Sequence, residues 1–509
     1  MNPLDALTGR LPMYRLVTLS LLVLVAVSLV LSATGTLFYR PAELLASLLV
    51  TVGGSWAATR LLGIVFRVRP HGESAVITGL ILFFLFLPTI DPVGLSVLAL
   101  AASIGAASKF LLVRHGRHLF NPAAVAAVVV GLTGLGAAGW WVGTPALAPV
   151  VAVLGLLIVW RTRTLGVVLL FLALAIVLVT VQLLAAGFDP GSSLATSIGS
   201  FPILFLGVYL LTEPLTLPPR RWQRFVVAAV VAVFVALPVS GGLTIGTFSL
   251  SSEFAVLMGN VAAALLALPR SARLRLTGTR DLGAGTAEFA FAADRPVPVE
   301  PGQYVELHVP HAHADGRGTR RHLTVVSARD QELRVAVRVP EGRSSSFKKA
   351  LATLEPGSPV RLTSVAGDFV LPRDRSVAVL LVAGGIGVTP IVSQLEGDAD
   401  RAAADVASTA SMPPRDAVVV YRAASLEAAA YLDRIAALAP VVLVTPTPPE
   451  PLPANVRWAA TLEEAFDDTT RLGERTAYVS GTPAFVNRAR RALRTRGVRR
   501  IRTDHFSGY

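Results

Sequence analysis

The sequence predicts a polytopic α-helical membrane domain of about ten spans, fused to an antiparallel β-barrel and an α/β nucleotide-binding domain. Hydrophobic residues make up 53% of the chain and charged residues only 16%, which is too apolar for an ordinary soluble protein. The apolar residues are concentrated before about residue 270, and a mixed, globular pattern follows. We therefore expect a transmembrane domain at 1–270, a barrel at 271–373 and an α/β domain at 374–509.

The apolar runs of the first half define the expected spans. A spanning helix needs roughly 20 mostly apolar residues, because no water in the bilayer satisfies its backbone groups. The first run, Leu16 to Leu31, lacks a small-residue cleavage site and is expected to remain as a helix. The ten runs fall near 16–34, 44–66, 74–88, 93–113, 122–139, 146–160, 164–186, 198–213, 223–240 and 250–268.

Lysine and arginine residues collect on alternate connections between these runs, as the positive-inside rule requires. One side receives only Arg40. Both termini are then cytoplasmic, and the protein is expected in the cell membrane with its C-terminal domains inside the cell. The other, cytoplasmic, side receives Arg10, Arg15, Arg67, Arg69, Lys109, Arg114, Arg117, Arg161, Arg163, Arg220, Arg221, Arg224, Arg270, Arg273 and Arg275.

The net charge of +13 does not indicate a nucleic-acid partner. The arginines of the first half stand singly or in pairs between apolar runs, without a stripe of basic and aromatic residues, so we interpret them as topology signals. The chain has no cysteine, which excludes disulfides, zinc-thiolate sites and cysteine-ligated iron–sulfur clusters. We expect no metal site.

Four local stretches of the first half carry a family resemblance: ITGLIL at Ile77–Leu82, Lys109, LFNPAAV at Leu119–Val125 and LTEPLTLP at Leu211–Pro218. Over roughly residues 15–268 the chain resembles the B subunit of the sodium-translocating NADH:quinone reductase and the D subunit of the Rnf complex. These are membrane subunits that carry flavin. The resemblance therefore implies flavin bound within the membrane domain.

The polar stretch GFDPGSSLATSIGS, residues 187–200, would by composition be a simple outward connection. In the resembled family a threonine in an outward loop carries FMN through a phosphoester, within a pattern close to Asp-Gly-x-Ser/Thr-x-Ala-Thr. The resemblance implies covalent FMN at Thr196, attached by a flavin transferase, and a further noncovalent flavin. Pro190 stands in the place of the family's Asp, with Asp189 displaced by one residue. The positions that match are Gly191, Ser193, Ala195 and Thr196.

Two carboxylates, Asp91 and Glu213, stand near the ends of expected spans. Charged groups in membrane segments often belong to an ion or proton path. An interfacial residue or a turn cap is the alternative for either one, and the sequence leaves both interpretations open.

The second half changes to short β-like runs separated by turns, from about Leu274 to Pro372, which is typical of an antiparallel barrel. From Ser376 the run VAVLLVAG leads directly into GGIGVTPIVSQL and an expected helix. A buried strand followed by a glycine-rich turn and a helix is the opening of a nucleotide-binding α/β unit. The barrel is therefore expected first and the parallel sheet second.

This order and its motifs resemble the ferredoxin-NADP reductase family over nearly all of residues 272–509. In that family an Arg-x-Tyr-Ser/Thr segment binds FAD: the Arg meets the pyrophosphate and the hydroxyl lies near the reactive nitrogen of the flavin. The Tyr position is Leu323 here, so the resemblance implies that the flavin packs on an aliphatic side chain. The residues implied to bind FAD are Arg321, His322, Leu323, Thr324, Ser345 and Ser346 of GRSSSF, and Phe369 of GDFVLP.

The resemblance extends to the nicotinamide nucleotide. The glycines of GGIGVTP let the backbone approach a pyrophosphate, and the following helix N-terminus favours the anion. Ser480 stands where many relatives have Cys, and the terminal DHFSGY segment is placed against the flavin in relatives. Thr324, Ser480 and Tyr509 are the expected catalytic residues. Those implied to bind NADH, NADPH or flavin are Gly384, Gly385, Gly387, Thr389, Pro390, Gly481, Phe506 and Tyr509.

Together the two resemblances imply an enzyme that oxidises cytoplasmic NAD(P)H through FAD and passes electrons through membrane-bound flavin to an extracytoplasmic acceptor. An NAD(P)H:quinone reductase acting within the membrane is the alternative, and a non-enzymatic flavin-carrying transporter or sensor is a third hypothesis. A haem-bearing reductase needs paired His ligands inside helices, and none of the eight His lies mid-span, so no haem is expected. Arg422, after the VVVYR run, is either a contact for a 2′-phosphate or a solvated side chain.

Overall fold

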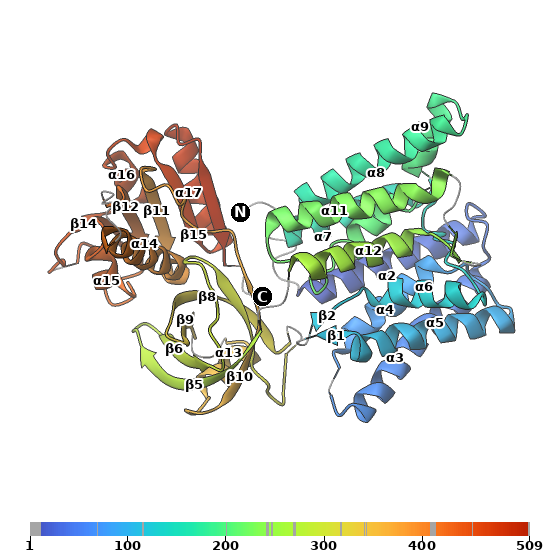
Figure 1. Ribbon diagram of the computed structural model, residues 1–509, viewed down its shortest axis with the longest axis horizontal. Coiled ribbons are helices and arrows are strands. Elements are labelled where there is room, and N and C mark those ends of the chain that lie inside the picture. Colours follow the sequence, from blue (N-terminus) through green and yellow to red (C-terminus); the bar gives the residue numbers. More distant parts are fainter. Residues whose placement is uncertain are drawn as a thin grey trace. The chain divides into compact units, whose positions relative to one another are not determined.

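The computed structural model divides into two compact units, residues 1–268 and 269–509 (Figure 1). The predicted site residue Tyr509 and the cytoplasmic-side residues Arg10, Arg69 and Arg270 lie outside the described residues. The structure describes residues 12–68, 70–114, 117–199, 201–240, 244–245, 248–267, 271–315, 318–339, 342, 344–407, 414–449 and 451–506.

The first unit is built from apolar helices around a core that includes Leu21, Phe84, Phe171 and Ala228. The tightest helix neighbours are α3 with α4 and α5, and α11 with α8 and α12. Its elements are α2 (Met13–Ala33), α3 (Pro41–Val65), α4 (Gly72–Leu85), α5 (Pro92–Leu111), β1 (Val113–Arg114), β2 (Arg117–His118), α6 (Pro122–Thr133), α7 (Ala148–Thr162), α8 (Leu165–Ala185), α9 (Pro190–Gly199), α10 (Ile203–Phe205), the π-helical turn η1 (Leu206–Leu210), α11 (Arg221–Ala236), the 3-10 turn η2 (Leu237–Ser240), β3 (Thr244–Ile245), β4 (Phe248–Ser249) and α12 (Ser252–Leu266).

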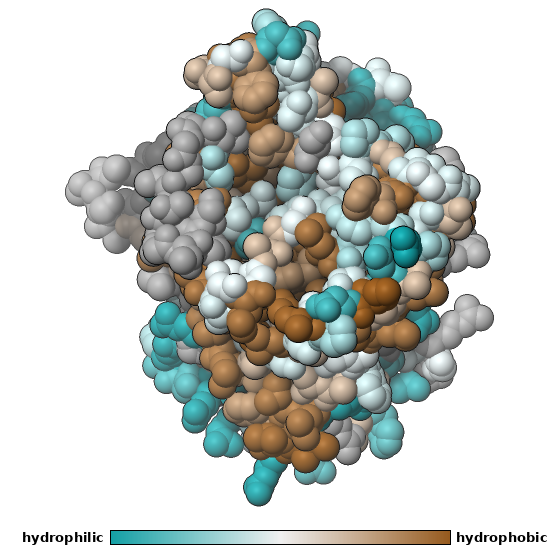
Figure 2. Space-filling view, turned by 90° about the vertical axis from the view of Figure 1, so that its right-hand side faces the viewer, coloured by the Kyte–Doolittle hydropathy of each residue, from teal (hydrophilic) through white to brown (hydrophobic). Residues whose placement is uncertain are grey.

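The outside of this unit is apolar as well as its core. Every large hydrophobic side chain that is exposed in the described residues belongs to the first unit, except Leu438. Leu49, Ile64, Val93 and Leu265 are examples, each more than 70% exposed. The face drawn in Figure 2 likewise carries broad areas of hydrophobic side chains. An apolar surface of this extent marks a membrane or protein interaction surface.

The predicted count of about ten membrane spans is wrong, because most of the helices are too short to cross a membrane. A helix lies within each of the ten apolar runs, but within the described residues only α2, α3, α5 and α8 are long and apolar enough to cross a membrane. A bent pair, Pro190–Gly199 with Ile203–Leu210, would make a fifth. The apolar runs overestimated helix length because they also include buried residues in non-helical backbone, such as Phe86, which forms an isolated bridge with Ala138.

The polar stretch expected as an outward loop forms helix α9 instead. Asp189 starts this helix, because its carboxylate accepts a hydrogen bond from Ser192 N at 3.0 Å. Ser197 is buried against α8, where Thr180 donates to its hydroxyl at 2.9 Å, whereas Thr196 is partly exposed. The small polar residues that suggested a loop are therefore those that let α9 pack closely on α8.

The second unit begins with a closed antiparallel barrel in the strand order β10-β5-β6-β9-β8-β7, as the sequence predicted (Figure 1). Alternating side chains such as Leu274, Phe291, Val305 and Val335 fill its interior. The elements are β5 (Ala272–Asp281), β6 (Thr286–Ala293), β7 (Tyr304–His308), β8 (Arg320–Arg329), β9 (Glu332–Arg338), α13 (Ser346–Ala352) and β10 (Pro359–Ala366).

A parallel sheet of order β14-β13-β12-β11-β15-β16 follows the barrel, with β11 in its interior. The strand β11 is buried throughout apart from its last residue, Gly384, and this explains its continuous apolar run. The elements are β11 (Val379–Gly384), η3 (Gly385–Val388), α14 (Thr389–Ala407), β12 (Ala417–Arg422), α15 (Leu432–Ala436), β13 (Val441–Val444), β14 (Val456–Ala459), α16 (Leu462–Asp467), η4 (Leu472–Glu474), β15 (Thr476–Gly481), α17 (Pro483–Thr495) and β16 (Ile501–His505).

Helix α14 joins the sheet to the barrel. Its Ser393 hydroxyl accepts a hydrogen bond from Gly302 N at 3.3 Å, and its Gln394 side chain donates to the carbonyl of Phe369. Gly302 has φ +97°, and a Cβ on it would lie 2.1 Å from the Phe369 carbonyl oxygen, so only glycine fits this turn. Barrel and sheet are therefore held in one fixed arrangement.

A buried carboxylate makes a second link between barrel and sheet. Glu288 on β6 accepts a hydrogen bond from the Tyr431 hydroxyl at 2.6 Å and lies 3.7 Å from Arg434 of α15. Arg280 and Arg334 on the neighbouring strands lie 3.8 and 3.6 Å from the same carboxylate. These partners compensate the burial of the Glu288 charge, which would otherwise be costly.

Candidate functional site

The first part of the candidate site is the corner where β8 begins beside the Gly/Ser-rich turn. Arg321 is buried, and its guanidinium lies 5.3 Å from the Phe347 ring centre at the start of α13 and 3.6 Å from Asp315. Asp315 also accepts a hydrogen bond from Ser346 N at 3.0 Å, and Asp315 N donates to the Ser346 hydroxyl at 2.9 Å. Ser345 caps α13. The predicted Arg321, Ser345 and Ser346 are thus brought together.

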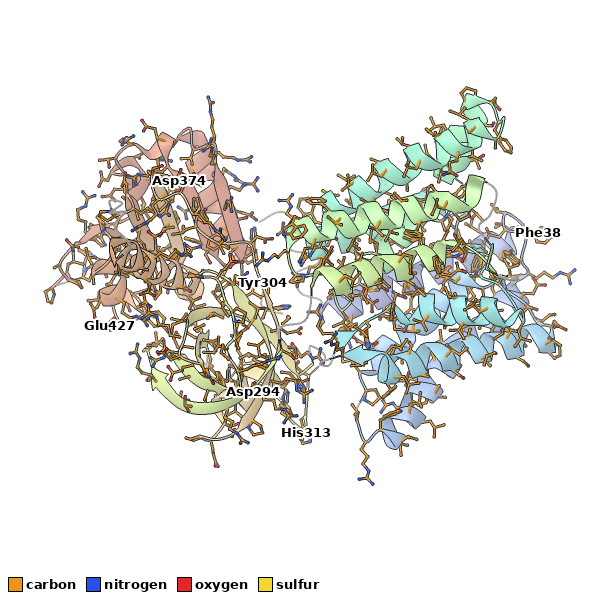
Figure 3. All side chains as sticks on the ribbon, viewed as in Figure 1. Phe38, Asp294, Tyr304, His313, Asp374 and Glu427 are labelled. Carbon is orange, nitrogen blue, oxygen red and sulfur yellow. The ribbon has the colours of Figure 1, made fainter. Side chains whose placement is uncertain are left out.

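The second part is the outer face of strands β7 and β8. Tyr304 pairs with Thr324 and Glu306 with His322, so these four side chains share one face of the barrel. The Tyr304 ring (labelled in Figure 3) lies 5.1 Å from the His322 ring. Leu323 points to the opposite face and packs against the barrel core. The side chain that provides an aromatic surface beside Thr324 is therefore Tyr304.

The third part is the turn that connects β11 to α14. Gly384, Gly385 and Gly387 form the end of β11 and the turn η3, and α14 begins at Thr389 with Pro390 in its first turn. A Cβ on Gly387 would lie 2.5 Å from the carbonyl oxygen of Ser480, so the turn packs directly on the end of β15. The Thr389 N–H donates to the Ile386 carbonyl, so η3 runs directly into α14. A glycine-rich turn at the N-terminus of a helix is the usual structure of a phosphate site.

The carboxyl ends of β15 and β16 adjoin this turn. Ser480 is fully buried, its hydroxyl has no hydrogen-bond partner among the described residues, and it pairs in register with Asp504 on β16. Burial raises the pKa of Asp504 to about 6, so a large fraction of this carboxyl is protonated at slightly acidic pH. Phe506 N donates to the Gly481 carbonyl at 2.8 Å, which holds the terminal segment at the end of the sheet.

Phe369 lies between the barrel part and the sheet part of the site. Its ring meets the Tyr478 ring edge-on at 5.4 Å, and both rings are buried. Val326, two residues after Thr324 on β8, belongs to the same apolar cluster as Phe369 and Val388 of the glycine-rich turn. Strand β8 thus runs from the Arg321 corner to the turn before α14, and the three parts lie on one rigid body.

Sequence reasoning did not find Tyr304 or Asp504. The motif was interpreted along one strand, but the side chains that lie beside Thr324 depend on the neighbouring strand. The register of β7 with β8 places Tyr304 beside Thr324. Alternation within β8 separates Leu323 from Thr324 and could have signalled this. Asp504 lies in the DHFSGY segment, where only the aromatic residues were considered.

In the helical unit, the structure decides the role of Asp91: its carboxylate accepts a hydrogen bond from Gly94 N at 2.9 Å and caps α5. Glu213 accepts a hydrogen bond from the Asn121 side chain at 2.9 Å, and Asn121 caps α6. The stretches LFNPAAV and LTEPLTLP are therefore in contact. Among the described residues, no group of three or more His, Cys, Asp or Glu residues could hold a metal ion.

No family model matches the chain. The chain is 25% identical over 227 residues to a flavohemoprotein of Rhodopirellula baltica, covering 41% of this chain and 53% of that protein. It is 33% identical over 110 residues to a glycine betaine monooxygenase reductase subunit of Chromohalobacter salexigens (21% and 28% covered), and 32% over 117 residues to an aromatic O-demethylase reductase subunit of an Amycolatopsis strain (22% and 34%). The chain thus spans about half or less of these relatives.

Solved structures give similar matches. An Amycolatopsis cytochrome P450 reductase aligns with a TM-score of 0.39 and 24% identity, covering 47% of this chain and 70% of that chain. The FAD/NAD-binding domain of a nitric oxide dioxygenase from Vibrio cholerae aligns with a TM-score of 0.37 and 18% identity, covering 46% and 98%. The second unit has the closed antiparallel barrel followed by a parallel sheet that the sequence predicted, and the relatives of the chain are flavohemoproteins and reductase subunits. The resemblance of the helical unit stays a prediction.

The raised pKa of Asp504 predicts a pH-dependent stability. Because its folded pKa of about 6 exceeds its usual 3.8, the folded unit binds more protons than the unfolded chain between these values, and stability falls as the pH rises through this window. Asp504→Asn is expected to remove that slope and to be more stable than the wild type above pH 6. Urea unfolding at a series of pH values checks this, with exposed Asp433→Asn as the control. An unchanged slope in Asp504→Asn would contradict it.

Proposed function

We propose that the second unit is an NAD(P)H-oxidising flavoprotein reductase that holds FAD between the Arg321 corner and the β7–β8 face. The observation that carries this is the position of two anion-binding features on one rigid body: a buried arginine beside a Gly/Ser-rich turn, and a glycine-rich turn at a helix N-terminus. The reductase subunits and flavohemoproteins similar to this chain support the same class of activity. FAD supplies the chemistry that accepts a hydride and releases electrons singly.

The residues of the Arg321 corner suit the pyrophosphate of FAD. The guanidinium of Arg321 presents a planar fork of donors that matches phosphate oxygens, and its burial keeps competing water away. The Asp315 carboxylate holds both groups in place, because it lies 3.6 Å from the Arg321 guanidinium and accepts a hydrogen bond from the Ser346 backbone N–H. Ser345 and Ser346 add hydroxyl groups at the same turn. In this proposal Thr324 and His322 contact the flavin ring, and Tyr304 provides the aromatic surface that Leu323 does not.

The sheet end suits the nicotinamide nucleotide. Gly384, Gly385 and Gly387 let the backbone approach the pyrophosphate, and the N–H groups at the start of η3, ahead of Thr389 and Pro390, are the proposed donors. Ser480, buried with an unpartnered hydroxyl in the described structure, positions the nicotinamide, and Gly481 leaves room beside it. Asp504 is placed to hold or release a proton next to Ser480. In this proposal Phe506 covers the flavin until the nucleotide enters.

For the whole chain we infer transfer of electrons from cytoplasmic NAD(P)H through flavin in the helical unit to an extracytoplasmic acceptor. The apolar exterior of that unit supports its position in the membrane. A hydrocarbon core of about 30 Å is too thick for one electron step, so a carrier within the unit is required. FMN attached to Thr196, on the partly exposed side of α9, fits this need, with a further noncovalent flavin and a flavin transferase as partner.

The second candidate is an NAD(P)H:quinone reductase that delivers electrons within the membrane. The short helices favour it, because α4, α6, α7 and α12 are apolar but have only 10–17 residues, so their ends lie at intermediate depths if the unit is embedded. A carrier or quinone bound there would not need to reach the outer face.

Arg321→Ala is expected to lower FAD affinity about 10- to 100-fold, because one or two charged hydrogen bonds to the phosphates would be lost. FAD retained after gel filtration of the detergent-purified protein, measured by its visible spectrum, checks this. Arg320→Ala, the adjacent residue on the other face of β8, is the matched control and should retain FAD. Arg321→Lys, which keeps the charge without the fork, should fall between them. Full FAD retention by properly folded Arg321→Ala would disprove the assignment.

Gly387→Ala is expected to reduce NADH- or NADPH-dependent ferricyanide reduction about 100-fold. Its Cβ would lie 2.5 Å from the Ser480 carbonyl oxygen, so the turn would have to shift away from β15. FAD content should stay near the wild-type value, since Gly387 lies away from the Arg321 corner. Gly473→Ala, whose Cβ would meet no atom within 4 Å, is the control. Wild-type turnover in Gly387→Ala would argue against nucleotide binding at this turn.

Thr196→Ala is expected to abolish reduction of an outer-face acceptor by vesicles supplied with NADH on the cytoplasmic side, while ferricyanide reduction by the second unit continues. Intact mass should show one FMN fewer than in the wild type. Ser192→Ala, a neighbouring hydroxyl of α9 outside the matched positions, should keep both the mass and the activity. Full outer-face reduction in Thr196→Ala would exclude this carrier, and retained quinone reduction alone would favour the second candidate.

A further inference from the structure

The C-terminal end of the second unit carries a dense positive charge that the proposed reaction does not use. Residues 488–502 contain eight arginines and no acidic residue. They occupy most of α17, the turn after it and the start of β16, which is an edge strand of the sheet. This segment is the most basic stretch of the chain.

Only some of these arginines have acidic partners. Arg488 pairs with Glu463 at 3.2 Å and Arg496 with Asp467 at 2.6 Å, so these two tie α17 to α16. The other exposed arginines make no ion pair or side-chain hydrogen bond within the described residues. Arg502 lies against the Tyr478 ring, 5.8 Å from its centre, and we call the remaining five the arginine face: Arg490, Arg491, Arg494, Arg499 and Arg500.

The arginine face follows from the helical period of α17. Val486, Ala489 and Leu493 are buried against the sheet, and this turns Arg490, Arg491 and Arg494 outward onto one side. Like charges three and four residues apart destabilise a helix by a few tenths of a kcal/mol per pair. An anion bound outside the helix would offset this repulsion.

We propose that the arginine face binds the anionic phospholipid headgroups of the membrane that the first unit occupies. Phosphate groups accept the planar fork of donors of a guanidinium, and the negative potential of the cytoplasmic leaflet attracts basic segments within a Debye length. The predicted topology puts the second unit on that side. The proposal concerns a surface separate from the glycine-rich turn and the Arg321 corner.

The short connection between the units keeps lipid within reach. Five residues, 267–271, separate the end of α12 from the start of β5, and an extended chain of this length spans at most about 20 Å. A tethered surface meets its ligand at a high effective concentration, so weak contacts suffice for occupancy. A soluble acidic protein or a nucleic acid has no such advantage, and this favours lipid as the occupant.

The test uses the full chain in nanodiscs of phosphatidylcholine alone or of phosphatidylcholine mixed with phosphatidylglycerol. Phenylglyoxal modification of Arg490, Arg491 and Arg494, followed by mass spectrometry of peptides, reports their accessibility. We expect modification at least three times slower in the anionic discs at low salt, and equal in both discs at high salt, because exposed charges are screened there. Equal rates in both discs at low salt would overturn the proposal.

A charge-matched pair of variants separates this surface from the overall charge of the unit. Arg490→Gln with Arg494→Gln should abolish the protection of Arg491 by anionic lipid. Arg373→Gln with Arg457→Gln removes two exposed arginines elsewhere, Arg457 lying at the opposite edge of the sheet, and should leave that protection intact. Loss of protection in both variants, or protection that arises only when an acidic protein or an oligonucleotide is added, would refute lipid as the specific occupant.

Discussion

The packing of α14 on the barrel is the contact on which the candidate site depends. This helix begins at the glycine-rich turn, and four and five residues after its first residue, Ser393 and Gln394 hold the barrel turns at Gly302 and Phe369. The same helix therefore fixes both ends of the site. Hydride transfer requires two ring systems at contact distance, and a displacement of about 1 Å is costly, so a single element that determines this distance is an effective design. The buried Glu288 network makes a second contact between barrel and sheet.

The two units expose opposite kinds of surface, although each has an apolar core of its own. The first unit leaves large hydrophobic side chains outside, whereas the second leaves only Leu438 among the described residues and presents charged side chains instead. Five residues, 267–271, connect the two units. In the proposed function, this short connection would couple the nucleotide chemistry of the second unit to electron transfer in the first unit.

The fold of the second unit could be predicted almost completely, because its signals are local. Alternating residues in β6 and β9, and the continuous apolar run of β11 before Gly384, correspond directly to strands that are buried on one face or on both. The helical unit was predicted less well. Hydropathy counts apolar residues whatever their backbone conformation, so buried bridges such as Phe86–Ala138 lengthened the expected spans. The small residues of α9 were assigned to a loop because composition does not show that a neighbouring helix buries Ser197.

The site shows the same division between local and long-range information. The glycine-rich turn was found from sequence because its strand, turn and helix are consecutive. Tyr304 was missed because it reaches Thr324 only through the pairing of β7 with β8, which separates them by twenty residues along the chain. A motif with Leu323 in place of an aromatic residue suggests a weakened flavin site when one strand is considered alone. The register of β7 with β8 places Tyr304 beside Thr324. In the proposed flavin site the aromatic surface therefore comes from the neighbouring strand, and Leu323 does not remove it.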